Sequence, residues 1–147
     1  MKALVLGGVG MVGQAVVRSL IGQEEVEKVR IGDIVTDRGR LHEKLRSSEK
    51  LELLEVDVND HQALLRAMEG VDVVVNCAGP FFRTGPKVAR AAIEAKVNYL
   101  DICDDCEVID FLFTPEIDEA AKRAGITVLT GICLLYTSDA ADDGESV

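Results

Sequence analysis

Gly8-Val9-Gly10-Met11-Val12-Gly13 follows directly on the apolar run Ala3-Leu4-Val5-Leu6, and this stretch decides the fold. A G-x-G-x-x-G pattern is a weak signal unless a strand precedes it and a helix follows it. Both are expected here, because Lys2–Leu6 is typical of a short buried strand and positions 12, 15, 16, 19 and 20 lie on one face of a helix. The sequence therefore predicts a helix that begins inside the glycine motif.

Each glycine of this turn has its own physical task. Gly8 allows the tight strand-to-helix turn, Gly10 lets the backbone approach a pyrophosphate, and Gly13 lets the helix pack closely on the strand. The free N–H groups at the start of the helix, around Met11 and Val12, attract the same anion. We therefore expect a dinucleotide cofactor at this turn. The alternative spacing G-x-x-G-x-x-G, counted from Gly7, implies the same cradle, and a turn that binds nothing is the plain structural alternative.

Apolar strand runs alternate with helical patterns, which is typical of an α/β domain with a parallel sheet and helices on both faces. Strands are expected near 2–6, 29–31, 53–58, 71–75, 99–102 and 126–129, and helices near 12–20, 40–49, 59–68, 86–95, 106–112 and 114–124. The 40–49 helix is expected to be largely exposed, Asn59 and Gln62 to form a capping box, and Pro86 to occupy a first helical position. Six strands with this turn predict a Rossmann-type doubly wound sheet in the order 3-2-1-4-5-6, as a single domain over residues 1–133.

The crevice of such a sheet opens between the first and fourth strands, at their carboxyl ends. Asp33 stands 20 residues beyond Gly13 (33 − 13 = 20), at the end of the second strand, where a carboxylate accepts hydrogen bonds from the adenosine ribose. Its charge favours NAD, because a 2′-phosphate would meet a like charge. Arg38 and Arg40 follow in the next loop and keep NADP open as the alternative.

Two further strand ends complete the candidate site. Asp57 and Val58 end the third strand beside the expected adenine pocket, although a helix-capping or exposed acid is the bland alternative for Asp57. Asn76, Ala78, Gly79 and Pro80 follow the fourth strand, where small residues and backbone groups should meet the nicotinamide ribose and ring. A glycine-proline turn that serves only the chain reversal is the alternative there.

Composition restricts the class of protein. The chain has 147 residues, 48% of them hydrophobic, which suits one packed domain. Its net charge is −10, of which four acids in the last 14 residues contribute −4, leaving −6 for the body. An acidic surface disfavours nucleic acid and anionic membranes as partners. The sequence shows no leader, and none of its apolar runs approaches the roughly 20 residues that a helix needs to span a bilayer. We therefore expect a cytoplasmic protein.

The cysteines and histidines do not indicate a metal or an acid–base site. Cys103 and Cys106 form a C-x-x-C, but no second such pair follows and two acids lie between them, so we expect ordinary reduced loop cysteines. His42 and His61 fall on expected helices away from the crevice. No metal ligand and no catalytic residue is assigned.

The chain resembles the NAD(P)-binding domain of the saccharopine dehydrogenase family over about residues 1–131. The most specific part is Asn76-Cys77-Ala78-Gly79-Pro80-Phe81, followed by an alanine-rich helix and Tyr99-Leu100-Asp101. This resemblance implies hydride transfer between a nicotinamide cofactor and the C–N bond of a small-molecule, amino-acid-derived substrate. It does not choose the substrate, and the oligomeric state, a homo-oligomer included, stays open.

A short-chain dehydrogenase, or a non-catalytic nucleotide-binding sensor related to it, is the alternative. Asn76-Cys77-Ala78-Gly79 also resembles the Asn-x-Ala-Gly motif of that group. Its chemistry needs Tyr-x-x-x-Lys, in which the lysine lowers the pKa of the tyrosine. Neither tyrosine fits, because Cys103 stands four residues after Tyr99 and Ala140 four after Tyr136.

The end of the sequence departs from the family it resembles. After Thr130-Gly131 the family continues into a substrate-binding domain, whereas residues 134–147 form a short acidic segment without a basic residue. Leu134–Asp143 resembles translated sequencing adapter, so we expect a disordered, artefactual tail on a fragment that is inactive alone. A genuine acidic tail is the alternative.

Overall fold

A computed structural model describes residues 1–132, so the expectations about the 134–147 tail lie outside the described residues. The core is a six-stranded sheet in the order β3-β2-β1-β4-β5-β6, in which every paired strand is parallel. This confirms the predicted Rossmann order. The strands are β1 (Lys2–Leu6), β2 (Lys28–Asp33), β3 (Leu51–Glu55), β4 (Val73–Asn76), β5 (Asn98–Asp101) and β6 (Val128–Leu129).

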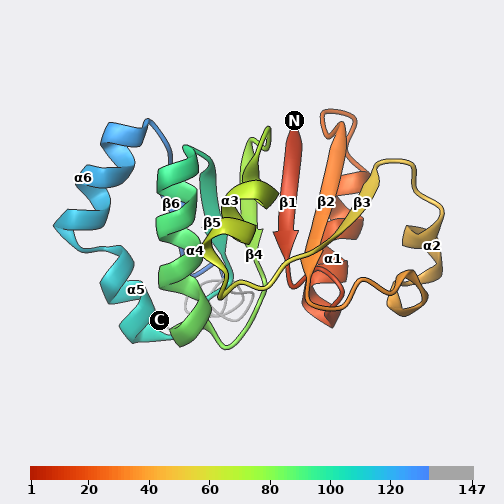
Figure 1. Cartoon of the computed structure of the whole chain (residues 1–147), viewed down its shortest axis with the longest axis horizontal. Helices are drawn as coiled ribbons and strands as arrows, with labels where there is room; N and C mark the ends of the chain where they lie inside the picture. Colours follow the sequence, from red (N-terminus) through yellow and green to blue (C-terminus); the bar gives the residue numbers. More distant parts are fainter. Residues whose placement is uncertain (133–147) are drawn as a thin grey trace, which may run out of the picture.

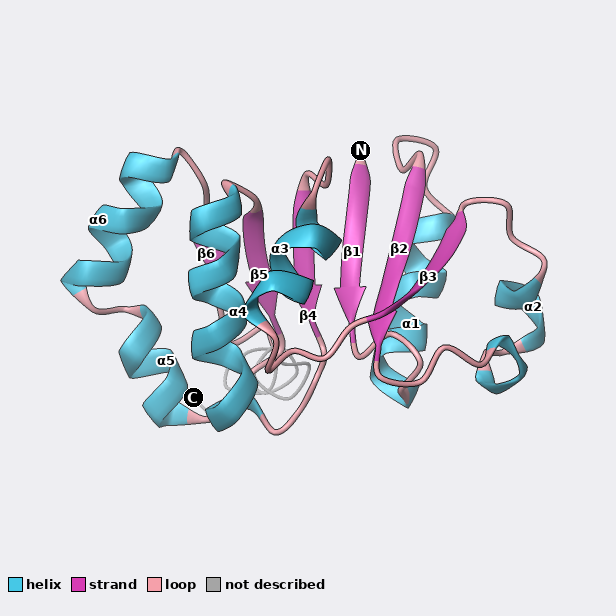
Figure 2. Cartoon of the chain, in the orientation of Figure 1, coloured by secondary structure: helices cyan, strands magenta, loops and turns pink. Residues whose placement is uncertain are grey.

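The helices flank this sheet on both faces (Figures 1 and 2). They are α1 (Met11–Ile21), a 3-10 turn η1 (Arg38–Arg40), α2 (Glu43–Arg46), α3 (His61–Met68), α4 (Phe81–Ala95), α5 (Cys106–Leu112) and α6 (Pro115–Ala124). In Figure 1, α3 and α4 lie in front of the sheet and α1 lies behind it. No helix within the described residues is long and apolar enough to cross a membrane.

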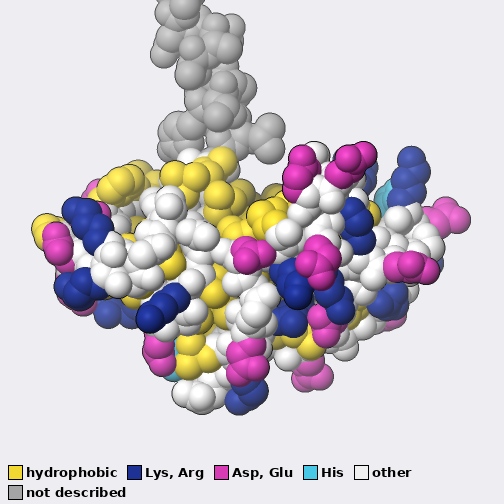
Figure 3. All heavy atoms as spheres, turned by 90° about the horizontal axis from the view of Figure 1, so that it is seen from above, with side chains coloured by type: hydrophobic (Ala, Val, Ile, Leu, Met, Phe, Trp, Pro, Cys, Tyr) yellow, Lys and Arg dark blue, Asp and Glu magenta, His cyan; other side chains and the backbone are white. Residues whose placement is uncertain are grey.

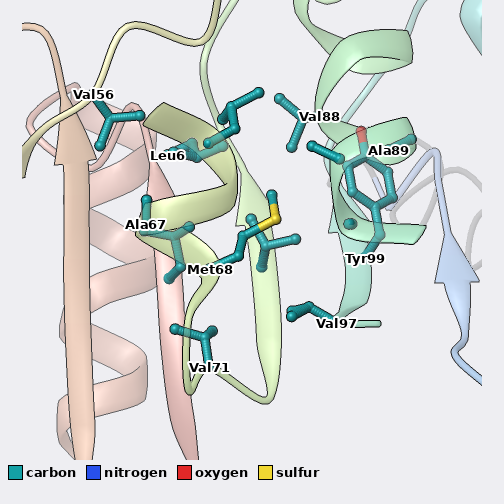
Figure 4. Close-up of a cluster of buried hydrophobic side chains, with 14 of the residues drawn as sticks. Leu6, Val56, Ala67, Met68, Val71, Val88, Ala89, Val97 and Tyr99 are labelled. Carbon is teal, nitrogen blue, oxygen red and sulfur yellow. The ribbon is translucent and has the colours of Figure 1, made fainter. Parts of the chain in front are cut away.

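Successive side chains of a strand point to opposite faces of the sheet, which divides the core into two clusters. Leu4 and Leu6 of β1 point into the cluster under α3, α4, α5 and α6, whereas Val5 points into the cluster that holds α1 and α2. Figure 4 shows Leu6, Met68 and Tyr99 among the side chains of the first cluster. Each large aliphatic side chain buried in this way stabilises the fold by about 1.5–3 kcal/mol. The two clusters hold the strand ends rigidly at the edge where the crevice is expected.

The segment between β2 and β3 does not form the helix predicted near 40–49 and contains only η1 and the short α2. It is largely exposed, as predicted, and among residues 40–49 only Leu41 and Leu45 are buried, at 1% and 0% exposure. The Arg46 guanidinium donates to the carbonyls of Leu41 and Gly39 at 2.8 and 2.7 Å, which replaces helical hydrogen bonds there. Burial of the two leucines against the sheet, rather than helix propensity, shapes this segment.

Helix α4 begins five residues before the position predicted from Pro86. Pro80, with an extended backbone (φ −77°, ψ 137°), is its N-cap, and the Pro80 carbonyl accepts the N–H groups of Arg83 and Thr84 at 3.0 and 3.2 Å. Pro86 therefore lies inside the helix and cannot donate to the carbonyl four residues earlier. The helix packs on the sheet through a face that includes Val88 and Ala92, which are both fully buried.

Two smaller predictions were also wrong. The N-cap of α3 is Asp60, whose Oδ1 accepts the N–H groups of Gln62 and Ala63 at 2.9 and 3.1 Å, and not Asn59. In α1, Val17 is completely buried while Val12 is 44% exposed, so the helix is rotated relative to the predicted face. The packing of its glycine motif on the preceding turn, described below, accounts for this rotation.

Acidic and basic side chains are interspersed over the surface seen from the amino ends of the strands (Figure 3). Several of them form exposed ion pairs, such as Lys2 with Glu27 at 3.7 Å and Lys28 with Glu52 at 3.5 Å. Exposed pairs of this kind contribute little to stability, about 0–1 kcal/mol each. On this face, therefore, neither sign of charge forms a separate patch.

Candidate functional site

A cleft of about 620 Å³ opens at the carboxyl ends of the central strands. Its walls come from four loops that follow β1, β2, β3 and β4, together with the first turn of α4 and Arg40. The lining residues are Gly7, Val9, Gly10, Gly32–Val35, Arg40, Val56–Asn59, Cys77–Pro80, Arg83 and Thr84. The sheet topology thus brings together four segments that are far apart in the sequence, at the crevice that the strand order predicts.

The glycine turn after β1 is tighter than the motif alone indicates. Gly7 has a φ of +71°, which favours glycine, and a Cβ there would lie 2.9 Å from both N and Cα of Ala78. A Cβ on Gly13 would lie 2.6 Å from Cα of Gly8. Gly7 therefore lets two loops of the cleft touch, and Gly13 lets α1 sit directly on the turn. Gly7 lies outside the G-x-G-x-x-G motif but is the first glycine of the alternative G-x-x-G-x-x-G spacing.

The first turn of α1 lies at the mouth of this loop. Gly10 is the N-cap and lines the cleft, and within residues 1–132 no side chain caps the free N–H groups of the turn. The Met11 and Val12 side chains are 88% and 44% exposed and do not line the cleft. Only their backbone groups are therefore suited to meet an anion. Gly8, which is buried, and Gly13 shape the turn from behind.

Asp33 ends β2 and lines the cleft as predicted. Its Oδ2 accepts the Val9 N–H at 3.1 Å, and its Oδ1 accepts the Val35 N–H at 3.2 Å. Each carboxylate oxygen has a second lone pair, so these bonds orient the side chain without exhausting it. Asp33 thus connects the glycine turn to the loop after β2.

The two arginines that follow Asp33 have different surroundings. The Arg38 guanidinium donates to the carbonyls of Arg46 and Leu51 at 3.1 and 3.3 Å and so stabilises the backbone of this loop. Arg40 lines the cleft, and its guanidinium makes no hydrogen bond or ion pair with another residue in 1–132. Gln14 of α1 holds this loop, since it donates to the Arg40 carbonyl at 3.2 Å. Of the two, Arg40 alone faces the cleft.

The loop after β3 contributes Asp57, Val58 and Asn59 to the cleft wall. The Asp57 carboxylate accepts the backbone N–H and the side-chain amide of Asn59 at 2.8 and 2.9 Å. These two bonds, backbone first, and the charge of Lys87 hold the pKa of Asp57 below its usual range. Lys87 in turn donates to Asn59 Oδ1 at 2.6 Å. Asp57 is therefore an exposed, ionised acceptor on the wall of the cleft.

The loop after β4 has a buried base and an exposed rim. Asn76 is fully buried and lies behind the wall, whereas Ala78, Gly79 and Pro80 line the cleft. The Gly79–Pro80 peptide bond is cis. Burial and the nearby charge of Asp101 raise the pKa of the Cys77 thiol to about 11. Cys77 is accordingly a neutral, half-buried thiol at the cleft edge.

The buried polar residues behind this loop form a connected cluster. Tyr99 donates its hydroxyl to Asp101 Oδ2 at 2.6 Å, and Asp101 Oδ1 accepts bonds from the Thr130 hydroxyl and the Gly131 N–H at 2.8 and 3.0 Å. Burial raises the pKa of Tyr99 far above its usual range, and the adjacent Asp101 charge adds to this. Tyr99 is therefore a structural hydroxyl, and this cluster fastens the ends of β5 and β6 to each other.

The remaining candidate groups lie outside the cleft. Cys103 is buried and Cys106 is exposed, and no group of three or more potential metal ligands occurs among residues 1–132. His42 caps α2, and His61 contacts Glu94 at 2.8 Å on the surface of α3 and α4. Sequence reasoning missed Arg83 and Thr84 as lining residues, because it began α4 at Pro86. The Pro80 N-cap was the signal that could have found them.

Sheet order, glycine turn and cleft together define a Rossmann domain of the class that binds nicotinamide dinucleotides. Residues 3–129 match the saccharopine dehydrogenase NADP binding domain, and the chain therefore belongs to this family.

Solved structures agree with this class. Saccharopine dehydrogenase (L-Glu forming) from Saccharomyces cerevisiae is 24% identical with a TM-score of 0.66, and the match covers 97% of this chain and 31% of that one. AtPrR2 in its apo form is 27% identical with a TM-score of 0.63, covering 90% and 48%. A dTDP-glucose 4,6-dehydratase from Bacillus anthracis, solved in complex with NAD, is 18% identical with a TM-score of 0.59, covering 69% and 36%. The chain thus spans about a third to a half of the length of these proteins.

Proposed function

We propose that this chain is the cofactor-binding half of an NAD(P)-dependent oxidoreductase of the saccharopine dehydrogenase type. The observation that carries the proposal is the convergence of four loops on one cleft, with a glycine turn at its base and an acid at the end of β2. When bound, the nicotinamide would supply or accept a hydride at the carbon of a C–N bond in an amino-acid-derived substrate. The groups that hold the substrate would lie on a part of the protein outside this chain.

The cleft residues divide into three subsites for a dinucleotide. Gly10 and the backbone N–H groups of Met11 and Val12 would face the pyrophosphate, with Gly8 and Gly13 shaping the turn. The contact between Gly7 and Ala78 leaves no room for a side chain, as expected where backbone must stay close to a ligand. These residues fit the central part of the cofactor.

The two ends of the cofactor would be held by different chemistry. At the adenosine end, Asp33 would accept hydrogen bonds from the ribose, and the ionised Asp57 carboxylate beside Val58 would accept from the exocyclic amine of the base. At the other end, Ala78, Gly79 and Pro80 would contact the nicotinamide ribose, with Asn76 supporting them from behind.

Cofactor preference is proposed to be NAD, with NADP as a close second. The negative charge of Asp33 disfavours a 2′-phosphate, but Arg40 lines the same cleft and has no partner among residues 1–132. A guanidinium without a protein partner is suited to a phosphate dianion. The two charges therefore oppose each other, and the preference is expected to be modest.

The experiment is a fluorescence titration of the purified chain with NADH and NADPH. Binding of either one at micromolar to low millimolar concentration supports the proposal, and the ratio of the two dissociation constants ranks the cofactors. Failure of both to bind at millimolar concentration would refute it. Addition of GTP to the NADH complex is the control for unspecific nucleotide binding, because displacement of NADH by GTP would lower the cofactor signal.

A small nucleotide-binding sensor is the second candidate. It is favoured by one observation, that the lining residues within 1–132 include no histidine, lysine or tyrosine that could move a proton. Such a module would also bind the dinucleotide. The two candidates separate when a longer protein carrying this domain is assayed for substrate-dependent NADH oxidation, which the sensor would not show.

A further inference from the structure

Ala78, at the nicotinamide end of the proposed cofactor site, is held by two buried side chains from opposite sides. Its N–H donates to Asn76 Oδ1 at 3.1 Å, and its carbonyl accepts the Thr84 hydroxyl at 2.5 Å. Asn76 and Thr84 are 0% and 4% exposed. The backbone N–H and the carbonyl of Ala78 are therefore both held by buried side chains, although Ala78 itself lines the cleft.

The position of Ala78 also bears on the glycine turn. The site of a Gly7 Cβ is only 2.9 Å from Ala78 N and Cα, so the two loops are in direct backbone contact. Ala78 therefore cannot move toward β1 without meeting the Gly7 backbone, so a displacement can only go toward the cleft, where it would alter the rim of the nicotinamide end while the glycine turn keeps its position. In the described part of the chain, Thr84 is the sole donor to the Ala78 carbonyl.

Thr84 reaches this carbonyl because α4 begins early. The helix starts at Phe81, so Thr84 lies in its first turn, beneath the loop, with its hydroxyl also 3.4 Å from the Pro80 carbonyl. The hydroxyl thus joins the start of α4 to the loop after β4. Valine has nearly the volume of threonine, so Thr84→Val opens no large cavity, but it removes the donor and leaves the Ala78 carbonyl without this hydrogen bond.

We propose that Thr84 is a positioning residue for the nicotinamide half of the bound dinucleotide, acting through the carbonyl of Ala78. The inference rests on the proposed function. Loss of the hydroxyl would free the Ala78 peptide, so that the loop samples positions in which it does not meet the nicotinamide ribose. The adenosine end of the cleft, which is formed by other loops, would be unaffected.

The test compares two ligands on four proteins. The ligands are NADH and ADP, and ADP carries the adenosine and both phosphates without the nicotinamide ribose. The proteins are the wild type, Thr84→Val, Thr84→Ser and Thr114→Val. Thr114 is the matched control, because its hydroxyl also donates to a backbone carbonyl, that of Phe111 at 2.8 Å, at the junction of α5 and α6.

Thr84→Val is expected to bind NADH about five- to tenfold more weakly, which corresponds to the loss of one hydrogen bond, and to bind ADP like the wild type. Thr84→Ser should restore NADH affinity, and Thr114→Val should leave both affinities unchanged. Thermal unfolding of each variant shows whether it is folded. Equal NADH affinity of Thr84→Val and wild type, or an equal loss for ADP, would overturn the inference. A wild type that binds neither ligand would instead overturn the proposed function on which it rests.

Discussion

Replacing Gly13 by alanine tests the close packing of α1 on the glycine turn. The added Cβ would lie 2.6 Å from Gly8 Cα, whereas carbon atoms pack at about 3.5–4.0 Å. The Gly7 carbonyl oxygen would lie closer still, so helix and turn must separate by at least about 0.9 Å, and neither side can yield by rotating a side chain, because the contacts are with backbone. Strain of this kind costs about 1–3 kcal/mol.

Gly22→Ala is the matched control for this substitution. Gly22 is the C-cap of the same helix with right-handed backbone angles (φ −76°, ψ −10°), and a Cβ there meets the Ser19 carbonyl at an ordinary 3.5 Å. Alanine at such a position should stabilise the protein by about 0.4–1 kcal/mol, because it restricts the unfolded chain. The two glycine substitutions in one helix are thus expected to act in opposite directions.

The assay is urea unfolding followed by circular dichroism, together with NADH titration under native conditions. Gly13→Ala should lower the free energy of unfolding by the amount above and weaken NADH binding at least tenfold, because the displaced turn forms the pyrophosphate cradle. Gly22→Ala should leave NADH binding unchanged. If Gly13→Ala is as stable as the wild type and binds NADH equally well, the steric reasoning is refuted.

Three further predictions concern single side chains. Arg40→Ala should weaken NADPH binding several-fold relative to NADH binding, whereas Arg38→Ala should mainly lower the stability of the fold and have little effect on the ratio of the two dissociation constants. An unchanged ratio in Arg40→Ala would contradict the assignment of Arg40 to the adenosine end. Asp60→Ala should lower the free energy of unfolding by about 1 kcal/mol because it removes the N-cap of α3, while Asn59→Ala should leave that cap intact. If urea unfolding shows that Asn59→Ala is the less stable of the two variants, the capping box is favoured instead. Cys106 should react with iodoacetamide at pH 8 well before Cys77, because Cys106 is exposed and the Cys77 pKa of about 11 leaves little of that thiol ionised. Peptide mapping by mass spectrometry measures the order of labelling, and Cys77 labelled first would contradict the prediction.

Much of the candidate site was accessible to sequence reasoning, because its residues stand at fixed points of the pattern. Gly10, Asp33, Asp57, Val58 and the 78–80 turn all line the cleft, since each follows a parallel strand and parallel strands end at one edge of the sheet. Which residues of these loops face the cleft could not be read in the same way. Arg38 and Arg40 are equivalent by sequence, and only the backbone carbonyls near Arg38 separate them.

Two of the errors share a cause, because the start of α4 and the cap of α3 depend on competition between neighbouring residues with similar local preferences. The buried face of α1 is instead set by the packing of Gly13 on the glycine turn. Asn59 and Asp60 are both good caps, and Asn59 is instead used by Asp57 and Lys87. Pro86 suits a first helical position, but burial of Thr84 and Gly85 outweighs the hydrogen bond lost at the proline.

The sequence by itself determined the class of the molecule: the period of the apolar residues defines strands and helices, and the glycine spacing defines the turn between the first pair. Those features are local, so they can be read residue by residue. The tertiary structure decided what depends on distant segments. It placed Ala78 against Gly7, directed the Thr84 hydroxyl to the Ala78 carbonyl, and put Arg40 on the cleft wall while Arg38 holds the backbone. Each of these outcomes depends on which groups meet across the sheet edge, and that is set by packing and not by propensity.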